Sequence, residues 1–156
     1  MLEDIVHDKN FANIMKKTIT DMIVLFFEKE HNFGILCQVE DVSFDPPLPQ
    51  EITEAFRPVT LFFLAGYTFE TARIENDMLV FEAGFGQENF GSVVYVPLLS
   101  ILQIIIDETP VLINVASYQP EQEKEEETPA PSIDEEGVKK SMELFLNNPE
   151  NAKFLK

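Results

Sequence analysis

The apolar residues near the start of the chain recur with the spacing of an α-helix. After Asn10, which can cap a helix, an apolar stripe runs through residues 11–30 and predicts a helix there. At positions 23–27 the stripe widens to five successive apolar residues, which point around more than half of a helix. Because a helix that covers one sheet needs only one apolar face, the surplus face predicts a second partner.

A two-fold related copy of the same helix is the simplest second partner. We therefore expect a homodimer whose interface includes four residues of this run, Ile23, Leu25, Phe26 and Phe27. The alternative is a helix that is buried on both sides within its own domain.

Beyond residue 32 the pattern becomes that of a β protein. Short apolar or alternating runs bounded by turn residues predict strands at 35–44, 59–64, 67–75, 79–85, 93–96 and 111–115. Asn76 and Asp77 predict a tight hairpin turn between two of these strands. Residues 50–56 predict a short turn or helix. The apolar run 98–106 follows Pro97 and predicts a short buried helix with the proline at its first position.

The composition changes abruptly after Ala116. Residues 119–132 contain three prolines, an acidic run and no aliphatic side chain larger than alanine. Such a segment cannot bury enough apolar surface to offset its loss of conformational entropy, so residues 117–131 are predicted to be an acidic disordered linker. Ser132 and Glu135 form a capping-box signature that begins a short C-terminal helix. The predicted organisation is a domain at 9–116, the linker, and a C-terminal segment at 132–156.

The charge of the chain excludes two classes of partner. The formal net charge is −17, which repels phosphate backbones and anionic lipid head groups, so we expect neither nucleic acid nor membrane as a partner. The longest apolar runs are too short to span a bilayer, and residues 1–8 are acidic and do not resemble a secretion signal. A cytoplasmic location is therefore expected.

The residue types needed for catalysis or for metal binding are scarce. His7 and His31 are the only histidines, and neither lies beside a candidate nucleophile or a second metal ligand. Cys37 is the only cysteine and lies in an apolar run that predicts a buried thiol. We therefore expect no catalytic residues, no metal and no cofactor, and the likelihood shifts from an enzyme towards a binding protein.

Two blocks of sequence together form a fairly specific pattern. The first is Asn76-Asp77 followed by an alternating strand that ends in Ala83-Gly84-Phe85-Gly86. The second, after a short loop, is Val94-Tyr95-Val96-Pro97 and the apolar run behind it. These blocks resemble the SspB family of adaptor proteins, which deliver substrates to the ClpXP protease. The order of the remaining predicted elements also resembles that family, and the similarity covers about residues 13–116.

The resemblance implies a mainly β fold with an N-terminal helix, in the form of a small, strongly bent Sm-like β-barrel or sandwich that dimerises through the helix. Members bind tagged peptides, such as the ssrA-type tag of stalled translation products, in a groove. By position, the groove would involve Tyr67, Thr68 and Phe69 from one strand and Ala83, Gly84 and Phe85 from the next. Gly84 stands where relatives often carry Arg, which bears on the choice of tag.

The resemblance also implies a docking motif at the C-terminal end of the sequence. The family's basic, two-apolar, lysine ending matches Lys153, Phe154, Leu155 and Lys156, which would bind the N-terminal domain of the ClpX unfoldase. Exposed apolar residues in a charged tail are typical of a recognition motif. The helical segment before this motif is not a feature that the resemblance implies.

Other interpretations of the same residues stay open. Alternation alone favours Phe81, Ala83 and Phe85 as plain core residues. An Sm-like or chaperone-like domain that binds a protein without delivering it to a protease is the alternative function, and an enzyme is a third. The C-terminal motif separates the first two, because a holding protein has no need of Phe154 and Leu155.

Overall fold

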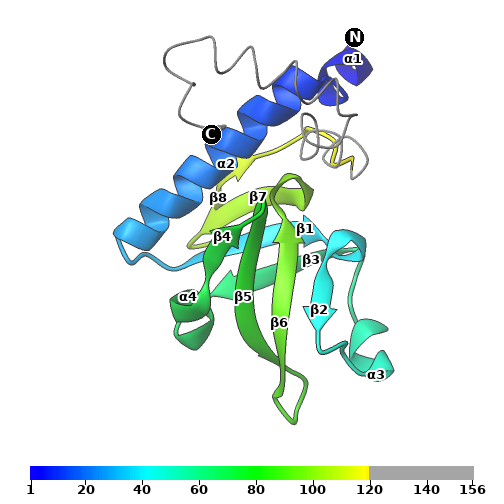
Figure 1. Ribbon diagram of the computed structural model, residues 1–156, viewed down its shortest axis with the longest axis vertical. Coiled ribbons are helices and arrows are strands. Elements are labelled where there is room, and N and C mark those ends of the chain that lie inside the picture. Colours follow the sequence, from blue (N-terminus) through cyan, green and yellow to red (C-terminus); the bar gives the residue numbers. More distant parts are fainter. Residues whose placement is uncertain (120–156) are drawn as a thin grey trace, which may run out of the picture. The chain divides into compact units, whose positions relative to one another are not determined.

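Two four-stranded antiparallel sheets and one long helix form the part of the chain that the structure describes. The structure is a computed structural model, and it describes residues 1–119 (Figure 1). Sheet A has the order β3-β1-β7-β8, with β1 Phe33–Gln38, β3 Val59–Leu64, β7 Ile101–Ile106 and β8 Thr109–Ile113. Sheet B has the order β2-β6-β5-β4, with β2 Ser43–Asp45, β4 Arg73–Glu75, β5 Met78–Phe85 and β6 Phe90–Pro97. A mainly β fold with an N-terminal helix is confirmed.

The long helix α2 spans Lys9–Glu28 and is preceded by a short helix α1, Leu2–Val6, which the sequence pattern did not predict. Asp8 caps α2, because its carboxylate accepts hydrogen bonds from the backbone N–H groups of Asn10 (2.7 Å) and Phe11 (3.0 Å). Asn10 as the cap was therefore wrong. A carboxylate is the better acceptor here, since it also interacts favourably with the positive end of the helix dipole.

The core joins the two sheets to the inner face of α2. Ile19, Ile23 and Phe26 of the helix pack with fully buried residues of both sheets, among them Phe33, Ile35, Leu64, Leu79, Phe81, Val94 and Ile104. Cys37 is 0% exposed in this core, as predicted, and burial raises the pKa of its thiol to about 12. Aromatic rings contact one another repeatedly in this core. The ring centroids of Phe62 and Phe81, for example, lie 5.9 Å apart. Phenylalanine thus supplies much of the buried surface.

The hairpin of β4 and β5 confirms its sequence signals. Asn76 and Asp77 connect the two strands with φ angles of 52° and 62°, the left-handed conformation that a two-residue hairpin turn requires. Leu79 and Phe81 point into the core with no exposed surface, while Glu82 and Gly84 lie at the outward positions. The strand predicted at 59–64 is β3 without a change of bounds.

Residues 67–75, predicted as one strand, form a short helix α4, Tyr67–Thr71, followed by the three-residue strand β4. Gly66, at φ 58°, turns the chain before α4. The Thr71 hydroxyl then accepts a hydrogen bond from the Glu82 backbone N–H (2.9 Å), which in a continuous strand would bond to a backbone carbonyl. The helical turn also lets Phe69 pack against the core. Tertiary contacts thus override the β propensity of Tyr, Thr and Phe.

The buried helix predicted at 98–106 is also wrong. Only Leu98–Ser100 form a single 3-10 turn, η2, and β7 follows it between β1 and β8. An apolar run of this length suits a buried helix or a central strand equally well by pattern alone. The isoleucines at 101, 104, 105 and 106 decide for the strand, because β-branched side chains fit a pleated sheet best.

The strand predicted at 35–44 is divided between the two sheets. β1 ends at Gln38, a 3-10 turn η1 covers Val39–Asp41, and β2 continues in sheet B. The turn carries the chain from one sheet to the other, which a single long strand cannot do. The predicted short helix is α3, Gln50–Thr53, in the excursion that follows β2.

The compact unit that contains both sheets extends over Met1–Tyr118. It is slightly longer than the predicted domain at 9–116, because the Ser117 backbone N–H bonds to Val6 and Tyr118 packs near Ala12. The predicted linker at 117–131, apart from its first three residues, and the predicted C-terminal helix and motif at 132–156 lie outside the described residues. No helix within residues 1–119 is long and apolar enough to cross a membrane.

Candidate functional site

The outward face of sheet B carries a groove whose floor is made by glycine. In the β5–β6 pairing, Gly84 lies directly opposite Gly91, so two neighbouring strands lack a side chain at the same level. A Cβ atom built on Gly91 meets no heavy atom within 4 Å. Glycine inside a strand often marks a place where another group approaches the backbone closely. The paired glycines therefore leave a hollow that a bound molecule can fill.

One end of this floor is covered by an asparagine from the β5–β6 turn. Asn89 has a φ of 56°, and its side chain lies over Gly84, because a Cβ atom there would come within 1.7 Å of Asn89 Oδ1. The amide group thus stands at the edge of the hollow with both a donor and an acceptor.

The next row across sheet B supplies the walls. Asp45 pairs with Val93, and Val93 pairs with Glu82, so the two carboxylates stand on either side of an apolar residue. Two strand spacings separate their Cα atoms, which is roughly 10 Å. The groove has a volume of about 390 Å³ and is lined by Asp45, Pro46, Tyr67, Glu82, Ala83, Gly84, Asn89, Gly91, Ser92 and Val93. We refer to it as the sheet-B groove.

Tyr67 forms part of one wall and is oriented by a short hydrogen bond. Its hydroxyl donates to Glu82 Oε1 at 2.5 Å, and this bond, together with the charge of Glu82, raises the pKa of the tyrosine. The ring is 64% exposed, so an aromatic face is held at the border of the groove and remains accessible. On the other side, the Ser92 hydroxyl donates to the Pro46 carbonyl (2.9 Å) and fastens the excursion after β2 to the sheet.

The sheet-B groove is acidic. Asp45 and Glu82 are its only charged lining residues. Arg73, the cation of the adjacent strand β4, is held by Glu75 at 2.6 Å and by the Thr71 carbonyl at 3.0 Å. The groove therefore combines a backbone floor, an aromatic side and two carboxylates, a set suited to a ligand with donor groups or positive charge.

The structure brings together three of the six groove residues named by the resemblance. Tyr67, Ala83 and Gly84 line the sheet-B groove, although Tyr67 comes from helix α4 and not from a strand. Ala83 also packs against the core, as the plain alternation reading expects. Thr68 is half-buried on α4, and its carbonyl accepts a hydrogen bond from the Thr71 hydroxyl.

The two phenylalanines of the set lie elsewhere. Phe85 points to the inner side of β5 and lines a pocket of about 750 Å³ between α3 and the β5–β6 turn. Its apolar lining includes Ile52, Phe56 and Phe90, and Glu51 and Glu88 also line it. Phe69 lines a third hollow beside Phe27 and Gly66. The position of Phe85 follows from the pleat, because residue 85 shares the inward face of β5 while residue 84 faces outward. Phe69 lies elsewhere because it belongs to helix α4.

Sequence reasoning missed more than half of the groove. Asp45, Asn89, Gly91 and Val93 join it only through the pairing of β2 and β6 with β5. Gly91 carried a weak signal, since a glycine at the start of a strand pattern suggests a close approach. Asp45 and Glu82 carried no such sequence signal, because no residues close to them in sequence place Asp45 level with Glu82.

The four residues predicted for a dimer interface on α2 do not share one face. Ile23 and Phe26 are 0% and 9% exposed and pack into the core of their own chain. Phe27 is half-buried against Phe33 and Phe69. Leu25 alone stands out, at 43% exposed. Three of the five apolar residues at 23–27 thus pack within one chain, while Val24 and Leu25 remain exposed.

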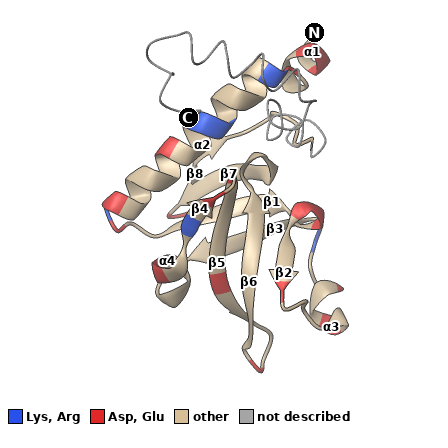
Figure 2. Cartoon of the chain, in the orientation of Figure 1, with Lys and Arg blue, Asp and Glu red and all other residues tan. Residues whose placement is uncertain are grey.

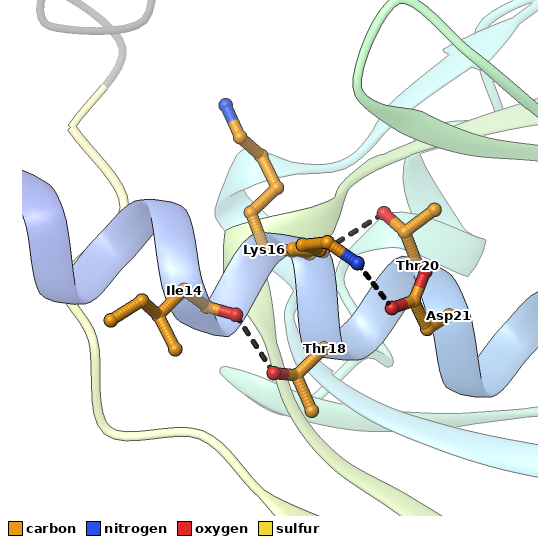
Figure 3. Close-up of polar contacts among 6 residues, drawn as sticks. Ile14, Lys16, Thr18, Thr20 and Asp21 are labelled. Carbon is orange, nitrogen blue, oxygen red and sulfur yellow. Dashed lines mark hydrogen bonds and ion pairs between the residues drawn. The ribbon is translucent and has the colours of Figure 1, made fainter.

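The exposed side of α2 is polar between its few apolar residues (Figure 3). Lys17 pairs with Asp21 at 2.7 Å, and the Thr18 hydroxyl donates to the Ile14 carbonyl at 2.8 Å. On the neighbouring side, Lys16 reaches Asp77 of the β4–β5 turn at 3.1 Å. These contacts hold the helix to itself and to the domain.

Comparisons with known proteins add no relative. No protein-family model matches the chain, and no curated protein and no solved structure matches it significantly. Within residues 1–119, no group of three or more His, Cys, Asp or Glu side chains is placed to hold a metal ion. The residues proposed to dock on the unfoldase, Lys153, Phe154, Leu155 and Lys156, lie outside the described residues.

The two floor glycines should respond differently to valine. Gly91→Val should leave stability unchanged or raise it by up to about 1 kcal/mol, because the new side chain meets open space and valine favours a strand. Gly84→Val should lower it, because Asn89 must leave its position. Urea unfolding followed by circular dichroism measures both variants. Equal stability of the two variants would contradict the placement of Asn89 over Gly84.

Proposed function

We propose that this protein is an adaptor of the SspB type, which binds a degradation-tagged peptide in the sheet-B groove and delivers the tagged protein to ClpXP. One observation carries the proposal. Tyr67, Ala83 and Gly84, which the resemblance named as groove residues, line one hollow that is floored by the paired glycines and large enough for part of a peptide. Binding sites are typically concave and carry a few placed polar groups that fix the orientation of the ligand.

An extended peptide suits the dimensions of the groove. The walls at Asp45 and Glu82 stand roughly 10 Å apart, about the width that one extended chain with its side chains occupies between neighbours. Peptide N–H groups would donate to the wall carboxylates, and the Asn89 amide would bond to a peptide carbonyl. The ring of Tyr67 would pack on an apolar side chain of the ligand. Each contact uses a group that already stands at the groove.

The charge of the groove bears on which tags it binds. Members of the SspB family often carry Arg at the position that Gly84 would match, whereas the charged lining residues of this groove are Asp45 and Glu82. A peptide carboxylate next to these walls would be repelled, whereas a lysine or arginine would be attracted. We therefore propose that this adaptor prefers tags with neutral or basic residues at the positions that lie in the groove.

Delivery would depend on the C-terminal motif and on assembly. In the proposed mechanism the Sm-like domain holds the tag, while Phe154 and Leu155 dock on the N-terminal domain of ClpX at the end of the acidic linker. In a homodimer two such motifs act together, so weak individual contacts suffice to raise the local concentration of the substrate at the unfoldase. The proposed setting is the cytoplasm, with no catalytic residues and no cofactor in the adaptor itself.

Filling the groove floor should abolish tag binding without unfolding the protein. Gly91→Val places two methyl groups where the peptide would lie, and we expect affinity for a fluorescent ssrA-type peptide to fall at least tenfold in an anisotropy titration. Ser43→Val is the matched control, because Ser43 faces outward on β2 one row away from the groove. Equal affinity in wild type and Gly91→Val would show that the peptide binds elsewhere.

The acidic walls should set a charge preference. In a peptide scan, replacing a groove-contacting residue by Lys should strengthen binding and replacing it by Glu should weaken it, each by roughly two- to fivefold, the scale of an exposed ion pair. Glu82→Gln should reduce this difference, and so should high salt. Glu70→Gln is the control, since it removes the same charge from a different hollow. A preference that is unchanged in Glu82→Gln would refute the role of this wall.

Removing the C-terminal motif should separate binding from delivery. Phe154 and Leu155 replaced together by Ala, or deletion of residues 153–156, should leave peptide affinity intact but abolish the stimulation of ClpXP degradation. Two apolar side chains buried in a docking site contribute roughly 3–6 kcal/mol, a loss of two orders of magnitude or more in affinity. Degradation of a tagged fluorescent protein measures this. Undiminished stimulation would favour a domain that only holds peptides.

A further inference from the structure

The four strands of sheet A contain no charged residue. β1, β3, β7 and β8 carry neither Lys, Arg, Asp nor Glu, although a quarter of the whole chain is charged. In Figure 2 these strands lack the coloured residues that mark α2, α4 and β5. The inward residues of a sheet are expected to be apolar. The outward residues of a sheet that faces water are expected to be polar, and here they are not.

The register of sheet A places these outward residues in rows. One row crosses the sheet as Phe63, Gly34, Ile105 and Pro110, and the next crosses it as Leu61, Leu36, Gln103 and Ile113. Val59 and Val111 extend the rows at the two edge strands. Gln103, and Gln38 opposite Val59, are the polar side chains on this face, and both are uncharged. The outward face of these rows, from Val59 to Ile113, is referred to as the sheet-A face.

The side chains of the sheet-A face pack on one another. A Cβ atom on Gly34 would come within 3.2 Å of Leu61 Cδ1 and 3.6 Å of a ring carbon of Phe63. The two side chains from β3 therefore lie across the neighbouring strand β1 and bury its glycine. On β3 and β1 the result is a packed apolar layer, and the register continues it across the sheet through Ile105 to Ile113.

This layer remains exposed in a single chain. Phe63 is 62% exposed, Ile113 61%, Leu61 54%, Val111 43% and Val59 41%. If a fully exposed side chain of this size presents roughly 150–200 Å², these five residues offer about 450 Å² of apolar surface on one copy. The largest apolar patch on a monomeric protein typically measures about 300–600 Å² and often marks a binding surface. The sheet-A face is a patch of this size, and it is therefore a candidate interface.

We propose that the occupant of the sheet-A face is a second copy of this chain, packed face to face about a two-fold axis. Two copies bury about 900 Å² from these five residues alone, and the half-buried Leu36 and Ile105 bring the total near the lower end of stable interfaces, about 1,200 Å². A two-fold contact needs a surface that complements itself, and a flat apolar sheet does so at a sheet separation of about 10 Å.

Charge also selects this face over the rest of the surface. Two copies of a chain with a net charge of −17 repel each other wherever carboxylates meet, so the contact must be a region without charge. The sheet-A face satisfies this condition. The exposed side of α2 does not, because Lys17 and Asp21 interrupt its apolar residues. The inference does not depend on the peptide function of sheet B, and it assigns the dimer contact to a sheet and not to the helix.

The test uses the full chain in sedimentation equilibrium with three single substitutions. Leu61→Glu on β3 and Ile113→Glu on β8 each introduce two charges into a two-fold contact, and each should weaken the dimer about a hundredfold or more. Leu25→Glu is the matched control on α2, with a similar exposed fraction, and should leave the dimer unchanged. Circular dichroism verifies that each variant is folded.

A second measurement needs no substitution. If the face is an interface, diluting the wild-type protein below the Kd of the dimer should expose the sheet-A face. The fluorescence of an added apolar dye, per mole of protein, should then rise. This readout decides the question if the charged variants do not fold.

Each outcome decides for or against the sheet-A dimer. A wild-type chain that is monomeric at all concentrations overturns it and assigns the face another occupant, and a dimer that Leu25→Glu alone dissociates assigns the contact to α2. Peptide titrations on the same variants keep the two proposals apart. A dissociated variant that still binds the tag supports the interface, and loss of tag binding in an intact dimer concerns only the sheet-B groove.

Discussion

The burial of large apolar side chains between the two sheets is the constraint on which both candidate surfaces depend. Phe33, Phe62 and Phe81 fill the space between sheets A and B, so the pleat sends their sequence neighbours outward. Gly34, Phe63 and Glu82 are such neighbours. A shift of one residue in a strand pairing would turn a glycine such as Gly34 or Gly84 into the core. It would also turn a phenylalanine such as Phe33 or Phe81 to the outer face. The sheet-B groove and the sheet-A face are thus the two outer surfaces of sheets that share one core.

How far the sequence predicts this structure depends on how local each signal is. β3 and the Asn76–Asp77 hairpin follow from patterns that a few adjacent residues carry, and both are confirmed. Helix α4 and strand β7 do not follow from local patterns. α4 depends on the hydrogen bond between Thr71 and the Glu82 backbone, and β7 depends on its neighbours β1 and β8. The groove divides in the same way. Gly84 lies within a recognisable block, whereas Asp45 reaches the site only through the register of three strands.

The two sheets divide the chemistry of the surface between them. All four charged strand residues belong to sheet B, at Asp45, Arg73, Glu75 and Glu82, and sheet A has none. A ligand at the sheet-B groove therefore meets carboxylates and oriented hydrogen bonds, which are sensitive to salt. A protein surface at the sheet-A face makes apolar contacts with uncharged residues, and salt does not screen such contacts. Under the two proposals, the same small domain engages two partners whose binding responds to different conditions.

The hydrogen bond from the Glu82 backbone to Thr71 decides how a chain can lie on sheet B. β4 pairs with only the first three residues of β5, so the rest of that edge would otherwise offer free backbone groups to any extended segment. α4 approaches this edge, and its Thr71 hydroxyl takes up the Glu82 backbone N–H. Under the proposed function, the ligand lies across the face of sheet B and does not lengthen the sheet. The contact with Thr71 thus withdraws a backbone donor at this edge of sheet B from pairing with another chain.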